Sequence, residues 1–368
     1  MPRSGKSPLA LRTVSALAIG ALTLAVTSAC AHATTSTTTA ATSATSSSGA
    51  SSGTAASSLR LGYFANVTHS TAIAEVANGT LQKDLGSTKL DTTIYSAGPA
   101  EMTALLGGQL DAAYVGPSSA LSAWTKSDKQ GLTIVAGAET GGAELVVDSK
   151  ITSAAQLKGT TIADPQLGNT QDVALRYWLK QQGYATTLQG GGQVTVQPEA
   201  NATTLTLFKE GKIQGAWLPE PWASRLVDEG DGHVLVDEKT LWPGGQFATT
   251  NLVVSNTYLA AHPQTVDELL DSQITTNTWI LANPAAAQTL ISGAIKKLTG
   301  STITAAEIQR SWTEESVTND PLVSSLTQEL AHAVSDGLLK NTSLTGIFNL
   351  TPLNQELAKA GQPTVPTS

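Results

Sequence analysis

The sequence predicts an α/β protein of two lobes with a helical C-terminal tail. Short apolar runs alternate with helical patterns over residues 59–254, which is typical of α/β layers with mainly parallel strands. About 310 of the 368 residues lie beyond residue 57, and one hydrophobic core usually divides beyond ~250–300 residues. After residue 256 the pattern becomes all helical. We therefore expect the chain to build two lobes and to return to the first lobe to finish.

The N-terminal segment predicts export. Arg3, Lys6 and Arg12 precede an apolar run at 14–26, and small residues lead from there to Cys30, the only cysteine of the chain. This is the pattern of a secretory signal and is too short for a membrane span. Its end resembles the lipobox of bacterial lipoproteins, which implies a signal peptide at 1–30 that ends at a lipidated Cys30. Plain secretion with a fortuitous cysteine is the alternative.

A linker is expected after this signal, and regular elements are expected after the linker. Residues 31–57 are almost entirely Ala, Ser, Thr and Gly, so we predict a disordered linker there. Apolar runs predict strands at 59–62, 92–95, 112–115, 133–136, 144–147, 161–163, 194–196, 215–217, 234–236 and 252–254. Helical periodicity predicts helices at 72–77, 100–106, 171–182, 203–210, 266–281, 284–297, 304–312 and 321–339.

The turn at 163–176 is the most informative stretch for function. A buried strand ends there, a Pro/Gly loop follows, and a polar cap opens an amphipathic helix. Free backbone N–H groups at a helix start can hold a small anion without Lys or Arg. An ordinary helix cap is the alternative interpretation. Arg176 lies four residues after Asp172, which favours an ion pair within the helix over a contact with a ligand.

Composition and motifs argue against several function classes. The net charge of −8 argues against nucleic acid as a partner. The five histidines are dispersed, without the spacing of a zinc site, so we expect no metal. The sequence has no GxSxG elbow and no P-loop. We therefore expect neither an enzyme nor a bound cofactor.

Several segments together carry a family resemblance. They lie at 61–64, 98–99, 106–117, 164–176, 207–217 and 219–222. In order and spacing the chain resembles the periplasmic substrate-binding proteins of ABC importers, in the branch for aliphatic sulfonates, taurine and nitrate, from about residue 59 to about residue 270. This resemblance implies a two-lobed type II periplasmic-binding-protein fold with two crossover hinge strands that closes on its ligand. Lobe one would span 58–143 plus 254–355, and lobe two 147–250.

Loops after strands are expected to face a cleft between these lobes, because ligands of open α/β sheets bind at the carboxyl ends of strands. His69 could donate to an anionic head group, and Glu220 could bind an amine or hold its Pro-flanked loop. Trp222 and Phe64 could stack on an organic tail, with core packing as the alternative for the tryptophan. The candidate ligand-binding residues are Phe64, Asn66, His69, Ser118, Gly168, Asn169, Thr170, Gln171, Asn201, Glu220 and Trp222.

The function implied by the resemblance is that of an extracytoplasmic solute-binding lipoprotein of an ABC importer. It would capture a small organic anion, an aliphatic sulfonate or taurine, or nitrate, and deliver it to the permease and its ATPase subunit. The lipid on Cys30 would anchor it, as a monomer, to the cell membrane. Two alternatives stay open: a lipoprotein ligand sensor of the same fold, and a binder of a thiamine-precursor-like pyrimidine.

Overall fold

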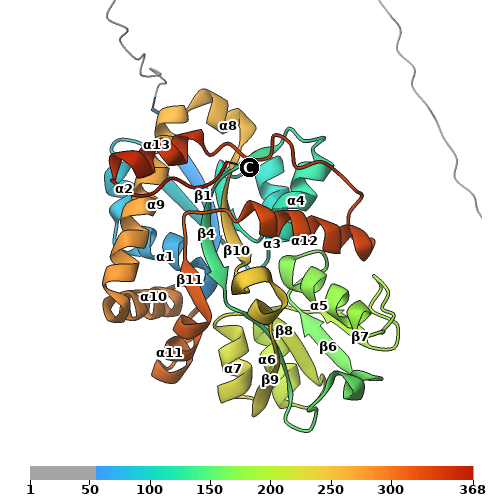
Figure 1. Cartoon of the computed structure of the whole chain (residues 1–368). Helices are drawn as coiled ribbons and strands as arrows, with labels where there is room; N and C mark the ends of the chain where they lie inside the picture. The colour runs from blue at the N-terminus through green and yellow to red at the C-terminus, as the bar shows by residue number, and fades with distance from the viewer. Residues whose placement is uncertain (1–54, 368) are drawn as a thin grey trace, which may run out of the picture. The chain divides into compact units, whose positions relative to one another are not determined.

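The structure, a computed structural model, describes residues 55–367 (Figure 1). The predicted signal peptide, Cys30 and the linker up to residue 54 lie outside these residues. Ala56, expected in the linker, belongs instead to the folded unit, where it is buried and its N–H donates to Thr265 Oγ1 at 3.0 Å. The Thr88 hydroxyl donates to the Ala56 carbonyl at 2.7 Å. The predicted boundary is therefore slightly too late, because two threonines hold this backbone.

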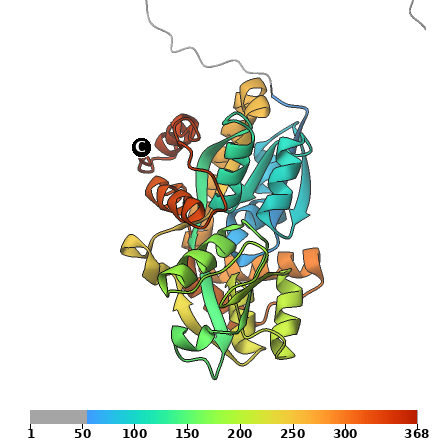
Figure 2. The same ribbon diagram turned by 90° about the vertical axis from the view of Figure 1, so that its right-hand side faces the viewer.

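The strands form two sheets, which occupy separate halves of the folded unit in both views (Figures 1 and 2). Sheet A has the order β11-β4-β10-β3-β1-β2, and sheet B has the order β7-β6-β8-β5-β9. We call sheet A with its helices lobe one and sheet B with its helices lobe two. The strands are β1 Ser58–Phe64, β2 Lys89–Tyr95, β3 Ala112–Val115, β4 Leu132–Gly141, β5 Ala143–Asp148, β6 Thr161–Asp164, β7 Thr195–Pro198, β8 Gly215–Pro219, β9 Gly232–Asp237, β10 Ala248–Ser255 and β11 Glu315–Val317.

Strand directions differ from the expectation of mainly parallel sheets. β1 pairs in parallel with β2 and β3, and β6 pairs in parallel with β7 and β8. The pairings of β10 with β3 and β4, of β11 with β4, and of β5 with β8 and β9 are antiparallel. The expectation is wrong because β5 and β10 follow crossings between the sheets. Such strands need no right-handed βαβ crossover and can enter their sheet in either direction.

Helices cover the sheets and form the C-terminal region. Most predicted helices are present within two or three residues of their expected bounds, and several short ones were not predicted. None of the helices in residues 55–367 has the length and apolarity that a bilayer crossing requires. The α-helices are α1 Ser70–Ala77, α2 Thr80–Asp84, α3 Gly98–Leu106, α4 Pro117–Lys126, α5 Thr170–Gln181, α6 Asn201–Lys209, α7 Trp222–Asp228, α8 Asn256–Ala261, α9 Pro263–Ala282, α10 Pro284–Thr299, α11 Ala305–Glu314, α12 Val323–Ser335 and α13 Thr351–Lys359.

The chain crosses from sheet A to sheet B at two consecutive glycines. Gly141 and Gly142 have φ values of 81° and 74°, a region that side chains disfavour. A Cβ at Gly141 would lie 2.5 Å from the Glu314 carbonyl oxygen, so this crossing needs glycine for space as well. The chain returns just before Ala248, where β10 begins. The predicted lobe boundaries stay a prediction until the lobes are observed to move.

Four apolar clusters form the core, with two clusters against each sheet. In lobe one they surround Leu61 and Leu121, and in lobe two they surround Trp217 and Leu218. Helices α3 and α4 each follow a strand of sheet A, and α5 and α6 each follow a strand of sheet B. Their first turns therefore lie at the carboxyl ends of the strands, where α/β proteins place ligands.

Candidate functional site

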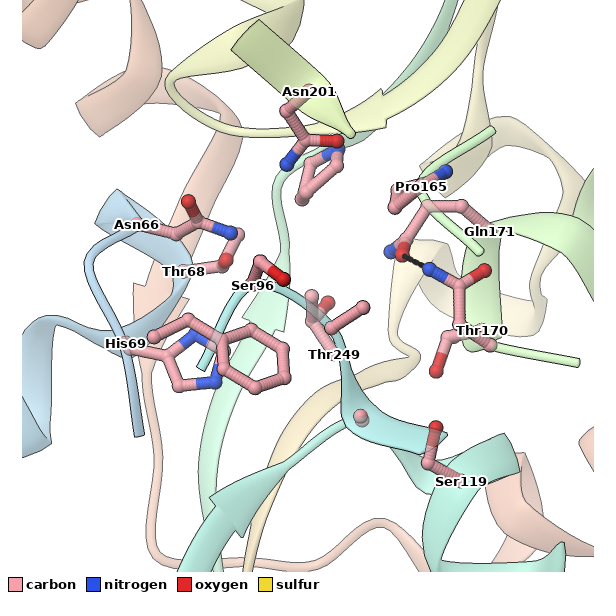
Figure 3. Close-up of a pocket in the computed structure, with 16 residues that line it drawn as sticks. Asn66, Thr68, His69, Ser96, Ser119, Pro165, Thr170, Gln171, Asn201 and Thr249 are labelled. Atoms are coloured by element: carbon pink, nitrogen blue, oxygen red, sulfur yellow. Dashed lines mark hydrogen bonds between the residues drawn. The ribbon is translucent and has the colours of Figure 1, made fainter. Parts of the chain in front are cut away.

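A small cavity lies between the two lobes, at the carboxyl ends of their parallel strands (Figure 3). Its volume is about 20 Å³, which is enough for one water molecule or a little more. A cavity of this volume accommodates a compact group and leaves no room for an extended tail. It is lined by Phe64, Asn66, Thr68, His69, Ser96, Ala97, Gly98, Gly116, Ser119, Pro165, Asn169, Thr170, Gln171, Asn201, Pro219 and Thr249.

The cavity wall carries no formally charged side chain among these described residues. Four helices, α3, α4, α5 and α6, begin at the wall, two from each lobe. The first N–H groups of a helix have no partner inside the helix, and they form the positive end of its dipole. The site therefore offers positive electrostatic potential from both lobes without lysine or arginine.

Hydrogen bonds fix the orientation of three amide side chains of the wall. Trp222 Nε1 donates to Asn66 Oδ1 at 3.0 Å, which leaves the Asn66 Nδ2 hydrogens as donors. Asn169 caps α5 by accepting from the Asp172 N–H at 2.8 Å, and its own Nδ2 donates to Gln171 Oε1 at 3.2 Å. Gln171 Nε2 is then the end of that amide left to donate. One amide donor from each lobe is thus available to a ligand.

Four further polar atoms of the wall are buried and have no hydrogen-bond partner within residues 55–367: His69 Nδ1, Ser119 Oγ, Thr170 Oγ1 and Asn201 Oδ1. Leaving a buried polar atom without a partner costs about 1–3 kcal/mol. Two of these atoms come from lobe one and two from lobe two, and all belong to residues of the same cavity (Figure 3). Their arrangement is that of a site which a polar ligand would complete.

His69 is neutral and presents an acceptor. Its Nε2 lies 3.2 Å from the Tyr114 carbonyl oxygen, which can only accept, so Nε2 carries the hydrogen. Burial lowers its pKa to about 3 and so disfavours a second proton. The Phe64 ring packs against the imidazole at a centroid distance of 4.3 Å. The expectation that His69 donates to an anion is therefore wrong, because its one N–H is already used.

Seven of the predicted binding residues line the cavity: Phe64, Asn66, His69, Asn169, Thr170, Gln171 and Asn201. Two others lie beside it. The Ser118 hydroxyl donates to Glu329 on α12, so it faces the core of lobe one and does not reach the cavity. Gly168 donates its N–H to Asp172 Oδ2 at 2.8 Å and shapes the loop before α5.

Glu220 and Trp222 also lie outside the cavity wall. Glu220 is fully buried and accepts from Arg310 Nη1 at 2.7 Å and from Ser311 Oγ at 2.9 Å. It therefore holds its loop, which is one of the two roles expected for it, and it does not belong to the cavity wall. Trp222 orients Asn66 through its indole N–H, so the expected stacking on a tail is replaced by positioning of a donor.

Residues that the sequence interpretation missed reach the cavity through tertiary structure. Ser119 is one residue after the predicted Ser118, and the helical turn places its hydroxyl on the cavity side of α4. Thr249 belongs to β10, which pairs with β4 far away in sequence. A polar residue at a helix start could have pointed to Ser119, whereas Thr249 has no local signal.

The predicted ion pair of α5 is confirmed. Arg176 Nε lies 2.6 Å from Asp172 Oδ1, and both side chains are buried. Arg176 Nη1 also donates to the Thr187 carbonyl at 2.7 Å. Asp164 is buried close by, and desolvation followed by the charge of Asp172 raises its pKa well above the usual range. Arg176 therefore supports the loop that carries the cavity residues and does not line the cavity itself.

One group of carboxylates in residues 55–367 has the spacing of a metal site. Oxygens of Glu144, Asp237 and Glu314 lie within 4.8 Å of one another. Protein cations already pair with this group: Arg310 Nη2 lies 2.6 Å from Glu144, and Lys239 Nζ lies 2.7 Å from Glu314. These contacts supply the positive charge that a metal ion would otherwise bring.

Lobe two contacts both a C-terminal helix and the loop after β1. The ring of Tyr177 on α5 stacks on His332 of α12 at 3.6 Å, and Lys180 Nζ donates to the Ser335 carbonyl at 2.7 Å. In the loop after β1 the Val67 N–H donates to the Glu220 carbonyl at 3.1 Å. These contacts hold the two halves together around the cavity.

Comparison with known proteins assigns the sequence to a family. A family model described as the NMT1-like family matches residues 52–294. The chain belongs to the NMT1-like family. A protein of Brucella abortus (strain 2308), whose name describes it as a candidate binding protein, is 25% identical over 215 residues, covering 58% of this chain. The match spans 63% of the length of that relative.

Solved structures share the fold. The alkanesulfonate-binding protein SsuA from Xanthomonas axonopodis pv. citri, bound to MOPS, has a TM-score of 0.66 at 20% identity and covers 80% of this chain and 99% of its own. The periplasmic nitrate-binding protein NrtA from Synechocystis PCC 6803 has a TM-score of 0.69 at 15% identity and covers 85% of this chain and 92% of its own. The predicted two-lobed periplasmic-binding-protein fold is therefore confirmed.

Proposed function

We propose that this member of the NMT1-like family is the extracytoplasmic solute-binding component of an ABC importer and that it captures a small oxyanion between its lobes. The observation that carries this proposal is the cavity wall, in which neutral donors from both lobes converge with four helix N-termini. A binding role, rather than a catalytic one, accords with the names of the relatives reported above.

The strength of such a site is sufficient for a physiological ligand. A micromolar complex requires about 8 kcal/mol. A hydrogen bond to a charged group contributes roughly 1.5–3 kcal/mol, and a partly buried helix N-terminus contributes up to ~2 kcal/mol. Side-chain donors of Asn66, Ser119, Thr170 and Gln171, with the helix ends, reach this range without a salt bridge.

The ligand we propose is a nitrate-sized anion or a short sulfonate such as taurine. A cavity of about 20 Å³ excludes a long tail while the lobes are closed. SsuA, of the same fold, is described as alkanesulfonate-binding, and NrtA as nitrate-binding. Taurine and longer aliphatic sulfonates alike would require the lobes to stand further apart than in this structure, whereas the compact oxyanion head group comes closest to the present volume.

Delivery and anchoring complete the proposal. The lobes at 58–143 plus 254–355 and at 147–250 would close on the anion and present it to the permease and its ATPase subunit. A lipid on Cys30 would hold the monomer at the outer face of the cell membrane. The N-terminal sequence pattern supports this anchor. Replacing Cys30 with serine should then release the protein from the membrane fraction.

Calorimetric titration with taurine, ethanesulfonate and nitrate tests the proposed capture, with a neutral aminopyrimidine as the competing ligand class. Thr170→Ala removes one donor from the cavity and should weaken anion binding about tenfold, because 1.4 kcal/mol is a factor of ten. Thr206→Ala, the same change on the exposed side of α6, is the matched control and should leave affinity unchanged. Binding of the pyrimidine alone, or an unaltered affinity in Thr170→Ala, would overturn the proposal.

A further inference from the structure

The polar atoms of the cavity do not all serve an anion in the same way. The hydroxyls of Ser119 and Thr170 and the amides of Asn66 and Gln171 can donate to a negatively charged oxygen. His69 Nδ1 cannot, because it holds a lone pair. His69 Nδ1 and Asn201 Oδ1 are thus acceptors in a wall that consists otherwise of groups able to donate. An acceptor repels a bare oxyanion, so the presence of the fixed Nδ1 needs a reason in the ligand.

Two contacts and the burial of the ring prevent His69 from turning its donor toward the cavity. The Tyr114 carbonyl holds the Nε2 hydrogen at a distance of 3.2 Å, on the side of β3. The Phe64 ring covers one face of the imidazole. The side chain is only 3% exposed, so water does not reach it freely. Burial also lowers its pKa to about 3, so the ring is neutral at physiological pH.

We propose that His69 is a specificity-determining residue whose Nδ1 accepts a hydrogen bond from the ligand and selects anions that carry an O–H or N–H group. This inference rests on the proposed anion-binding function and narrows its ligand class. Hydroxy- and aminoalkanesulfonates and bicarbonate carry such a donor. Nitrate and simple alkanesulfonates do not, and they leave Nδ1 buried without a partner.

Pairs of anions with the same shape isolate this effect. Bicarbonate and nitrate are both planar, three-oxygen anions of charge −1; bicarbonate carries a hydroxyl hydrogen on a carbon centre, and nitrate has a nitrogen centre and no hydrogen. Isethionate and 1-propanesulfonate differ by a hydroxyl in place of a methyl group. We expect the donor-bearing member of each pair to bind at least about tenfold more tightly to the wild-type chain, which corresponds to 1.4 kcal/mol.

Two variants assign the preference to His69. His69→Phe keeps an aromatic ring beside Phe64 and removes the acceptor, so the preference within each pair should fall to about twofold or less. His69→Asn places an amide oxygen near the former Nδ1 and should retain most of the preference. Calorimetry at pH 8 on the full chain measures all four ligands.

The outcomes separate this inference from the function on which it rests. If none of the four anions binds to the wild-type chain, the proposed function fails. If both members of each pair bind with equal affinity, the anion site stands and the role of His69 is wrong, as it would be if a water molecule satisfied Nδ1. Tighter binding of nitrate than of bicarbonate would show that His69 donates, and would also overturn the inference. The affinities of the paired anions for the wild-type chain test the inference even if His69→Phe fails to fold.

Discussion

Arg310→Met should destabilise the protein in a pH-dependent manner. Arg310 lies on α11 and pairs with two carboxylates of lobe two, Glu220 at 2.7 Å and Glu144 at 2.6 Å. Both carboxylates are buried, with exposed fractions of 0% and 3%. Methionine retains much of the apolar stem of the arginine but leaves both acidic groups without their cation, which is the costly way to break a buried ion pair.

The sign of the pH effect follows from the pKa values. Desolvation, then the neighbouring Glu220, raises the pKa of Glu144 to about 7, and desolvation also raises that of Glu220. Arg310 opposes both shifts, so its removal raises both values further. Below about pH 3 these groups are protonated in the folded and unfolded chains alike. As the pH rises, the unfolded chain loses its protons first and the folded state loses stability, until the folded pKa is passed.

The expected loss for Arg310→Met is about 3–5 kcal/mol at pH 8, and roughly half of that or less at pH 5, where the carboxyl groups can take up protons. Urea unfolding followed by tryptophan fluorescence at both pH values measures it. Lys239→Met is the control, because its partly exposed pair with Glu314 should contribute no more than ~1 kcal/mol. Equal losses at pH 5 and pH 8 would refute the reasoning.

Two further predictions concern the cavity. In Gly116→Ala the new Cβ would lie 2.4 Å from Thr170 Oγ1 across the cleft and would hinder the approach of the two lobes. The affinity for the anion should therefore fall more than tenfold, while the midpoint of unfolding changes little. Gly293→Ala, with open space on α10, should stabilise the fold by about 0.5–1 kcal/mol and leave titration calorimetry unchanged; a similar affinity loss in both variants would contradict the steric argument. Trp222→Phe removes a bond of 3.0 Å to a cavity amide and should weaken binding about fivefold, from ~1 kcal/mol per hydrogen bond. Trp124→Phe, which breaks a bond to a distant carbonyl, should not affect affinity, and an equal effect of the two changes would argue against a positioning role.

The fold was largely predictable because its elements carry strong local patterns. β3 has the predicted bounds, 112–115, since four consecutive apolar residues are fully buried. β11 was not predicted, because Glu315 and Ser316 have no strand pattern and pair with β4 only at the sheet edge. Strand direction was misjudged because the chain crosses between the sheets, a feature of tertiary structure that local periodicity does not record.

The candidate site was predictable only in part. Asn169, Thr170 and Gln171 could be found because a cap at the start of a helix after a strand is a local signal. Ser118 was chosen where Ser119 lines the cavity, because neighbouring positions on a helix point about 100° apart and sequence alone does not set that angle. The Tyr114 carbonyl, 45 residues away, determines which ring nitrogen of His69 carries the hydrogen. No sequence pattern near the histidine indicates this contact.

The uncharged cavity wall has a kinetic consequence. The chain carries a net charge of −8, so its long-range field repels an approaching anion. Helix ends attract only within about one turn, after the anion has entered the cleft. Added salt screens the repulsion over a Debye length of about 8 Å at physiological ionic strength and should not slow association, whereas it would slow capture by a lysine or arginine clamp. Differences in affinity among anions should therefore arise mainly from their rates of dissociation, which the buried hydrogen bonds control.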